Sequence, residues 1–279
     1  MKHSQIEKNL SSPAVEQTQK EKSFPFLTGF IHELNKRNPT LFWYGILNLF
    51  AALICIILIQ TTTIEVNNIN AFIKPLKFFI SIAIFCFTVG WIFHYLQLPR
   101  KVRAYNIMAV IVFTFESFVI TWQAANGRLS HFNTTTPLYG VLFSLMGIAI
   151  VVLTLWTGYF GVLFFRRKEW NIPMPYVWGI RLGILFFVVF ALEGGVMARM
   201  LQHTVGGDDG GKGLPLVNWN REHGDLRIAH FLGMHTLQIF PLFGYFIAKS
   251  SRAVKIFAAV YAGLVSAVLI QALMGLPLL

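Results

Sequence analysis

The chain has 279 residues, of which 55% are hydrophobic and 13% are charged, and its mean hydropathy is +0.60. Soluble domains carry a charge on about a quarter of their residues, so this composition excludes a disordered chain, a fibrous protein and most soluble folds. In a soluble protein, a net charge of +11 would suggest binding to nucleic acid. Here the basic residues lie in short segments between apolar runs, which indicates membrane topology and no nucleic-acid partner.

The first 38 residues differ from the rest of the chain. Residues 1–23 are polar with mixed charge, so we expect a disordered cytoplasmic tail and not a signal peptide. Residues 24–38 place four apolar side chains on one helical face, which suits a short helix in the membrane interface and equally a loose linker before the membrane. That face comprises Leu27, Phe30, Ile31 and Leu34.

Seven apolar runs follow, each near the length of about 20 residues that a helix needs to cross a bilayer. They cover residues 40–60, 75–96, 105–123, 138–165, 177–200, 227–248 and 256–277. These runs predict an all-α polytopic bundle of about seven transmembrane helices, with a single membrane domain over 39–279. The longest connection, 201–226, is rich in glycine.

Lysine and arginine residues predict the orientation of this bundle. Most of the 23 lie in the N-terminal tail and in alternate connections, around 100–103, 166–168 and 249–255. Cytoplasmic segments of membrane proteins are enriched in these residues. We therefore expect the N-terminus inside and the C-terminus outside.

Four stretches of the sequence carry a resemblance to a known family. They are IKPLKF (73–78), SHFN (130–133), GKGLP (211–215) and GDLRIAHFLGMH (224–235). Each resembles a stretch of a family of bacterial polytopic inner-membrane proteins, and the resemblance covers most of the chain after residue 40. It implies a multi-pass protein of the inner membrane, but it transfers no activity and no catalytic residue.

Polar side chains within the predicted helices gather in the outer half of the bilayer. A charged side chain there costs about 2.5 kcal/mol or more, so it usually has a partner and a purpose. Lys74, Lys77 and Ser81 follow the spacing i, i+3, i+7 and therefore share one helical face. The polar residues that we expect to bind a substrate are Lys77, Ser81, Gln123, Arg128, His131, Arg227 and Gln238.

Four titratable residues of the same half are the candidates for catalysis, namely Glu116, Glu193, His230 and His235. Helical rise places both glutamates about 10 Å below the outer surface, at the depth of Lys77. We therefore expect Lys77 to pair with one of them, either for function or only to lock helices together. His230 and His235 lie about 140° apart around one helix, so they need not point to one centre.

The densest ligand-like cluster comprises His223, Asp225, His230 and His235, of which the first three are the candidate metal ligands. Histidine and carboxylate ligands suit zinc or another divalent transition metal, and histidines that are only hydrogen-bonded are the alternative. Haem is a less favoured cofactor, because it needs two imidazoles at like depth on facing elements. Two aspartates in the glycine-rich connection would suit a divalent cation, but their spacing differs from a calcium loop and favours a flexible surface loop.

The sequence leaves three functions open. One is a membrane-embedded enzyme for a lipid or small anionic substrate. In this enzyme Lys77, Arg128 and Arg227 would hold the anionic group, and the glutamates and histidines would act as acid, base or metal ligand. Another is a transporter or channel for a proton, an ion or a small solute, since such pathways use buried lysine and glutamate. The third is a receptor, assembly factor or scaffold with a structural polar cluster. The oligomeric state does not follow from the sequence.

Overall fold

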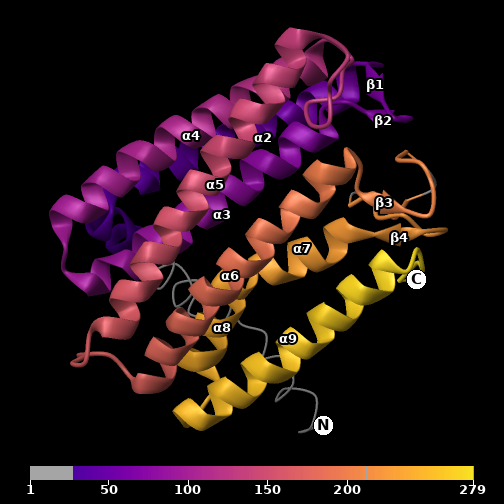
Figure 1. The fold of residues 1–279 in the computed structure, drawn as a ribbon. Helices are drawn as coiled ribbons and strands as arrows, with labels where there is room; N and C mark the ends of the chain where they lie inside the picture. The colour runs from indigo at the N-terminus through magenta and orange to yellow at the C-terminus, as the bar shows by residue number, and fades with distance from the viewer. Residues whose placement is uncertain (1–27, 211–212, 216, 279) are drawn as a thin grey trace, which may run out of the picture.

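The computed structural model of the protein describes residues 28–210, 213–215 and 217–278. After a helical segment over 28–37, the helices are α2 (Pro39–Thr61), α3 (Ile73–Phe93), a 3-10 turn (His94–Leu96), α4 (Pro99–Ala125), α5 (Pro137–Arg166), α6 (Met174–Met200), α7 (Leu226–Met234), α8 (Thr236–Phe246) and α9 (Ser251–Leu273). The strands are β1 (Glu65–Val66), β2 (Ile69–Asn70), β3 (Thr204–Val205) and β4 (Gly224–Asp225). The described chain is thus an almost entirely helical bundle, as predicted (Figure 1).

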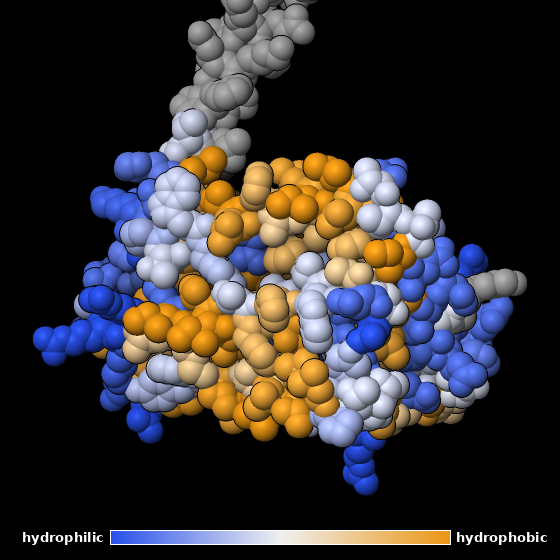
Figure 2. Space-filling view, turned by 90° about the horizontal axis from the view of Figure 1, so that it is seen from above, coloured by the Kyte–Doolittle hydropathy of each residue, from blue (hydrophilic) through white to orange (hydrophobic). Residues whose placement is uncertain are grey.

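Six of the seven predicted apolar runs form helices that are long and apolar enough to cross a membrane. Within the described residues these are α2, α3 with its following turn, α4, α5, α6 and α9. Figure 2 shows a hydrophobic band across the middle of the molecule, with hydrophilic residues toward both ends. This is the architecture of a multi-pass integral membrane protein.

The remaining run, predicted over 227–248, is not one continuous helix. It forms α7 and α8, which are separated at His235. At the break, the hydroxyl of Thr236 donates to the backbone carbonyl of Gly233 at 2.7 Å, and within α8 Pro241 has no N–H to donate. Together α7 and α8 lie along α6 and α9 (Figure 1). Each piece alone is shorter than the roughly 20 residues of a transmembrane helix.

The main core lies between α3, α4, α5 and α6 and is rich in aromatic side chains. The rings of Phe93 and Phe160 stack with their centroids 4.1 Å apart, and the hydroxyl groups of Tyr105 and Thr157 lie 2.7 Å apart. Helix α8 approaches α6 so closely that a Cβ atom on Gly179 would collide with the backbone of α8. Side-chain packing therefore holds α3, α4, α5 and α6 together, and close backbone contact joins α8 to α6.

A buried amide pair ties the start of α2 to α4. Asn38 caps α2, because its side-chain oxygen accepts a hydrogen bond from the N–H of Leu41 at 3.1 Å. Its amide group also exchanges two hydrogen bonds with the amide of Asn106, at 2.8 and 3.2 Å. Each of these buried polar groups thereby finds a partner inside the bundle.

Two small antiparallel β-ribbons and the C-terminal end of the chain lie at one end of the bundle (Figure 1). Strands β1 and β2 are joined by Asn67 and Asn68, whose φ angles of 53° and 60° are those of a type I′ hairpin turn. Strand β3 pairs with β4, with Thr204 opposite Asp225. The described part of the connection 201–226 is therefore folded over the bundle end, and it is not an open surface loop.

The predicted interfacial segment over 24–38 is helical in its described part, residues 28–37. Its last residue, Arg37, binds Glu33 at 2.8 Å and places its guanidinium 3.8 Å from the centre of the Trp91 ring. This cation–π contact attaches the segment to α3. The predicted disordered tail, residues 1–23, lies outside the described residues.

Candidate functional site

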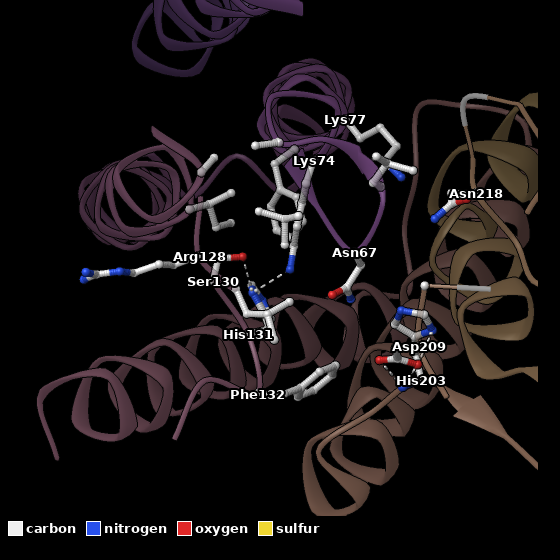
Figure 3. Close-up of a pocket in the computed structure, with 18 of the residues that line it drawn as sticks. Asn67, Lys74, Lys77, Arg128, Ser130, His131, Phe132, His203, Asp209 and Asn218 are labelled. Carbon is white, nitrogen blue, oxygen red and sulfur yellow. Dashed lines mark hydrogen bonds and ion pairs between the residues drawn. The ribbon is translucent and has the colours of Figure 1, made fainter. Parts of the chain in front are cut away.

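A cavity of about 200 Å³ lies at the end of the bundle that carries the two β-ribbons. Its walls come from the start of α3, the last turns of α4, the segment 128–132, the β1–β2 hairpin and the connection between β3 and β4. Figure 3 shows these segments converging, although they lie far apart in the sequence. The cavity is therefore a product of the tertiary fold.

Lys74 points from the first turn of α3 toward His131 (Figure 3). Its ammonium nitrogen lies 3.2 Å from Nδ1 of His131, and the hydroxyl of Ser130 lies 3.2 Å from the same nitrogen. The imidazole is in contact with the rings of Phe78 and Phe132. Burial and the charge of Lys74 hold the pKa of His131 well below its usual range. The histidine is therefore neutral, and its Nδ1 accepts a hydrogen bond from the ammonium group.

Lys77 lies one turn further along α3, and its ammonium group donates to the backbone carbonyl of Val217 at 3.3 Å. Among the ion pairs that the described residues form, none includes Lys74 or Lys77. The expected pairing of Lys77 with Glu116 or Glu193 is therefore wrong. Lys77 sits close enough to the start of its helix to reach the connection that covers the cavity.

His203 and Asp209 face each other on another side of the cavity, with Nδ1 and Oδ1 separated by 3.1 Å (Figure 3). Asp209 also accepts hydrogen bonds from the backbone N–H groups of His203 and Thr204, at 3.2 and 3.0 Å. Burial and the charge of Arg227 lower the pKa of His203 to about 4, although Asp209 and Asp225 act in the opposite direction. At neutral pH the ring is therefore uncharged, and its Nδ1 also lies 3.3 Å from the hydroxyl of Thr204.

Asp225 organises the connection above the cavity, and its side chain is fully buried. Its Oδ1 accepts from the backbone N–H and Nε of Arg227 at 3.0 and 2.9 Å, and its Oδ2 accepts from Nη2 of Arg227 at 2.6 Å and from the N–H of Asn220 at 2.8 Å. Burial raises the pKa of Asp225, but the hydrogen bond and charge of Arg227 outweigh this effect and lower it. Arg227 therefore lines the cavity with its charge already offset.

Three residues that line the cavity have left-handed backbone conformations, with φ angles of 53° at Asn67, 62° at Phe132 and 53° at Asn218. Asparagine adopts this conformation readily, whereas for phenylalanine it costs about 1–2 kcal/mol. The ring of Phe132 packs edge-on against Phe143, with centroids 5.6 Å apart. Such strain persists only where the surroundings over-determine it, and it concentrates at functional sites.

Glu116 lies below the cavity, one turn deeper in α4 than Ile120, which lines it. One turn corresponds to about 6 Å along the helix axis. Glu116 is only 4% exposed, and its Oε1 has no hydrogen-bond partner among the described residues. Gln123, on the same helical face, is also buried and has an unpartnered Oε1.

Four of the residues predicted to bind substrate, Gln123 among them, have no polar group in the cavity. Ser81 is exposed on α3. Arg128 directs its guanidinium away from the cavity (Figure 3) and over the ring of Tyr139, 5.1 Å from its centre. Gln238 donates to the hydroxyl of Thr88 at 3.1 Å, between α8 and α3. Of the predicted set, Lys77, Arg128, His131 and Arg227 line the cavity, although the Arg128 guanidinium points away from it.

The predicted catalytic residues have separate partners. His230 lies in α7, with its Nδ1 3.2 Å from Oε2 of Glu193 in α6. His235 lies at the break between α7 and α8, with its Nδ1 3.2 Å from Oε1 of Gln238. Glu116 contacts neither pair and lies below the cavity instead. The four predicted catalytic residues therefore do not meet at one centre.

The predicted metal ligands are likewise separated. Asp225 is engaged by Arg227, and His230 by Glu193, whereas His223 packs against the backbone of a glycine. The two aspartates of the glycine-rich connection are also divided, one exposed and the other bound to backbone N–H groups. Among the described residues, no group of three His, Cys, Asp or Glu side chains is arranged to hold a metal ion.

Sequence reasoning missed Asn67 and Phe132, which shape the cavity. It placed Lys74 on the helical face of Lys77 without naming it as a site residue, and it considered Asp209 only as a cation ligand. Lys74 lies one turn from Lys77 on the same helical face, and this spacing was a usable signal for a shared site. The Asn67–Asn68 pair is a signal for a type I′ turn. No pattern indicated Phe132, because its position follows from an unusual backbone conformation.

Comparison of the chain with known protein families, with curated proteins and with solved structures finds no match. The site is therefore interpreted from its own geometry. Residues 73–78, 130–133 and 224–235 each contribute to the cavity wall. The fold thus gathers these distant stretches around a single cavity.

Proposed function

We propose that this membrane protein binds a small oxyanion, with a phosphate, sulfate or carboxylate group, in the cavity at the ribbon-bearing end of the bundle. The observation that carries the proposal is the pair Lys74 and Lys77. Both line one cavity, and neither forms an ion pair among the described residues. Both lysines are partly buried. A partly buried charge without a counter-charge is destabilising, and a bound anion offsets this cost.

The remaining polar groups of the cavity also favour an anion. His131 is neutral, so it positions the Lys74 ammonium without cancelling its charge. Asp209 is the one carboxylate among the described residues that line the cavity, and its oxygens accept hydrogen bonds from the backbone N–H groups of His203 and Thr204. The lysines thus keep an excess of positive charge toward the cavity.

The size and position of the cavity favour a small anion from water over a lipid headgroup. The hairpin and the β3–β4 connection form its walls at the end of the bundle. A volume of about 200 Å³ has room for one oxyanion and a few waters, since a water in the liquid takes about 30 Å³. The walls therefore suit a ligand that arrives from the aqueous side.

The distribution of lysine and arginine supports a bundle whose ribbon-bearing end faces the outside of a bacterial inner membrane. The resemblance of the four stretches to an inner-membrane family supports the same location. None of the predicted catalytic residues is among the described residues that line the cavity, so the proposed function is binding. Enzymatic, transport and scaffold roles stay predictions.

Isothermal titration calorimetry of the detergent-purified protein with sodium sulfate tests the proposal. We expect wild type to bind sulfate, and Lys74→Gln and Lys77→Gln each to weaken the affinity about tenfold to a hundredfold, because a hydrogen bond to a charged group contributes about 1.5–3 kcal/mol. The matched control is Lys249→Gln, an exposed lysine between α8 and α9, which should leave the affinity within about twofold. Equal weakening in all three variants would contradict the assignment.

The same titration in lipid nanodiscs separates the two sources of an anionic group. If the cavity takes a soluble oxyanion, sulfate binds equally in phosphatidylcholine and phosphatidylglycerol nanodiscs, apart from screening by the lipid charge. If phosphatidylglycerol abolishes sulfate binding and Lys74→Gln lowers the phosphatidylglycerol that remains bound on delipidation, then the cavity holds a lipid headgroup and the soluble-anion proposal is wrong.

A further inference from the structure

Asp209 gives the cavity wall a hydrogen-bond acceptor of a kind that the two lysines do not supply. Lys74 and Lys77 line the cavity from α3, whereas Asp209 lines it from the connection between β3 and β4. Figure 3 shows Asp209 across the cavity from Lys74. Among the ion pairs of the described residues, none joins either lysine to Asp209. The space between these opposite charges is therefore open to a ligand.

The two oxygens of the Asp209 carboxylate are engaged unequally. Oδ1 accepts hydrogen bonds from the backbone N–H groups of His203 and Thr204, at 3.2 and 3.0 Å, and it lies 3.1 Å from Nδ1 of His203. Oδ2 shares the backbone N–H of His203, at 3.3 Å, and has no further partner among the described residues. Because an ionised carboxylate has about four acceptor positions, Oδ2 can accept another hydrogen bond.

A carboxylate in an anion site distinguishes oxyanions by their protons. At pH 8, sulfate and hydrogen phosphate are both tetrahedral dianions, but hydrogen phosphate carries one O–H group. That group can donate a charge-assisted hydrogen bond to a carboxylate, whereas every oxygen of sulfate is an acceptor and is repelled by it. The amides of Asn67 and Asn218 and the hydroxyl of Ser130 also line the cavity. These neutral groups can donate or accept, so they do not discriminate between the two anions.

We propose that the cavity selects hydrogen phosphate over oxyanions that lack an O–H group. Lys74 and Lys77 bind its charged oxygens, and Oδ2 of Asp209 accepts the hydrogen bond from its O–H. This inference rests on the proposed function and specifies its ligand. A sphere with the volume of the cavity is about 7 Å across, so a phosphate ion held by the lysines lies within reach of the opposite wall. Phosphodiester lipid headgroups have no such O–H and fall outside the selected class.

Isothermal titration calorimetry at pH 8 and constant ionic strength tests the selectivity of the detergent-purified protein. Sodium sulfate, sodium phosphate and sodium methyl phosphate are the ligands. We expect wild type to bind phosphate about tenfold to a hundredfold more tightly than sulfate, because a hydrogen bond to a charged group replaces a repulsion. Methyl phosphate has a methyl ester in place of the O–H, so it should bind about as weakly as sulfate.

Asp209→Asn tests whether this carboxylate reads the proton. Asparagine keeps one oxygen for the backbone N–H groups of His203 and Thr204, and it can place an NH₂ donor where Oδ2 lies. We expect phosphate to lose affinity and sulfate to gain it, so that the ratio of the two affinities falls about tenfold or more. Asp208→Asn is the matched control, because Asp208 is exposed in the same connection and should keep the wild-type ratio. A purely structural role of Asp209 would lower both affinities and leave their ratio unchanged.

The outcomes are distinct. A preference for phosphate that is lost in Asp209→Asn and kept in Asp208→Asn supports the proposal. Equal binding of phosphate and sulfate by wild type, or a ratio that Asp209→Asn does not change, overturns this inference and leaves the proposed function intact. Binding of methyl phosphate as tightly as phosphate also overturns it, and this comparison needs no variant. Absence of binding of all three anions to wild type overturns both proposals.

Discussion

Asp225 holds the connection over the cavity, so its replacement by asparagine should open that connection. The carboxylate accepts four hydrogen bonds, from the backbone of Asn220 and Arg227 and from two nitrogens of the Arg227 side chain. Asparagine keeps one oxygen that can cap α7, but it removes the charge opposite Arg227. The substitution therefore leaves a guanidinium in the cavity wall without its counter-charge.

The geometry sets the size of the effect. Removing one partner of a buried ion pair costs about 3–5 kcal/mol. Arg227 keeps 25% of its side chain exposed, so water offsets part of the loss. We expect a cost of about 2–3 kcal/mol, which corresponds to a roughly 30- to 150-fold increase in the population of the open connection.

Hydrogen exchange, followed by mass spectrometry on the detergent-purified protein, measures the population of the open connection. The amides of Asn220 and Arg227, which donate to the carboxylate, should exchange about 30- to 150-fold faster in Asp225→Asn, while the core helices keep their protection. Asp208→Asn is the control, because Asp208 is exposed in the same connection. If both variants exchange at the wild-type rate, the carboxylate does not hold the connection and the reasoning is refuted.

Three further predictions concern pH and packing. The pKa of His203 is about 4 in the closed connection, so the open connection binds a proton more readily. The protection of the connection against hydrogen exchange should therefore fall progressively from pH 6.5 to pH 4. His203→Gln should flatten this pH dependence. Gly233→Ala places a Cβ atom against a core phenylalanine ring of α6 and should cost about 1–3 kcal/mol in thermal unfolding, whereas Gly263→Ala, which meets no atom within 4 Å, should not destabilise. Asn106→Leu leaves the amide of Asn38 with an unpaired donor and should cost about 1–3 kcal/mol, and an unchanged melting temperature would show that the amide pair is dispensable.

The sequence predicted six of the membrane helices correctly. For the run over 227–248 it predicted one helix, whereas the structure has α7 and α8. Six apolar runs appear as helices close to their predicted limits, because the length and composition of a membrane span depend only on the local chain. The break at His235 depends instead on Thr236 and on the packing of α7 and α8 against α6, which apolar content does not report. The small strands were also missed, since two-residue pairings leave little pattern in a sequence.

The sequence predicted the depth of each polar residue in the bilayer, but it did not predict the direction in which each side chain points. Lys77, His131 and Arg227 do meet at one cavity, as their common level in the bilayer suggested. Gln238 has a similar predicted depth, yet it faces Thr88 between two helices. Depth along a helix follows from counting residues, whereas the direction of a side chain follows from the rotation of the helix within the bundle.

What the sequence by itself determined is the membrane class, the helical fold and the set of polar residues near one end, because these follow from composition and from the rise of a helix. Only the tertiary structure decided which of these residues share a site. It joined Lys74 to His131 and Asp225 to Arg227, and it kept His230 and His235 apart. The reason is that packing between helices and the left-handed turns of the connecting segments set side-chain directions, and neither is encoded in a local pattern.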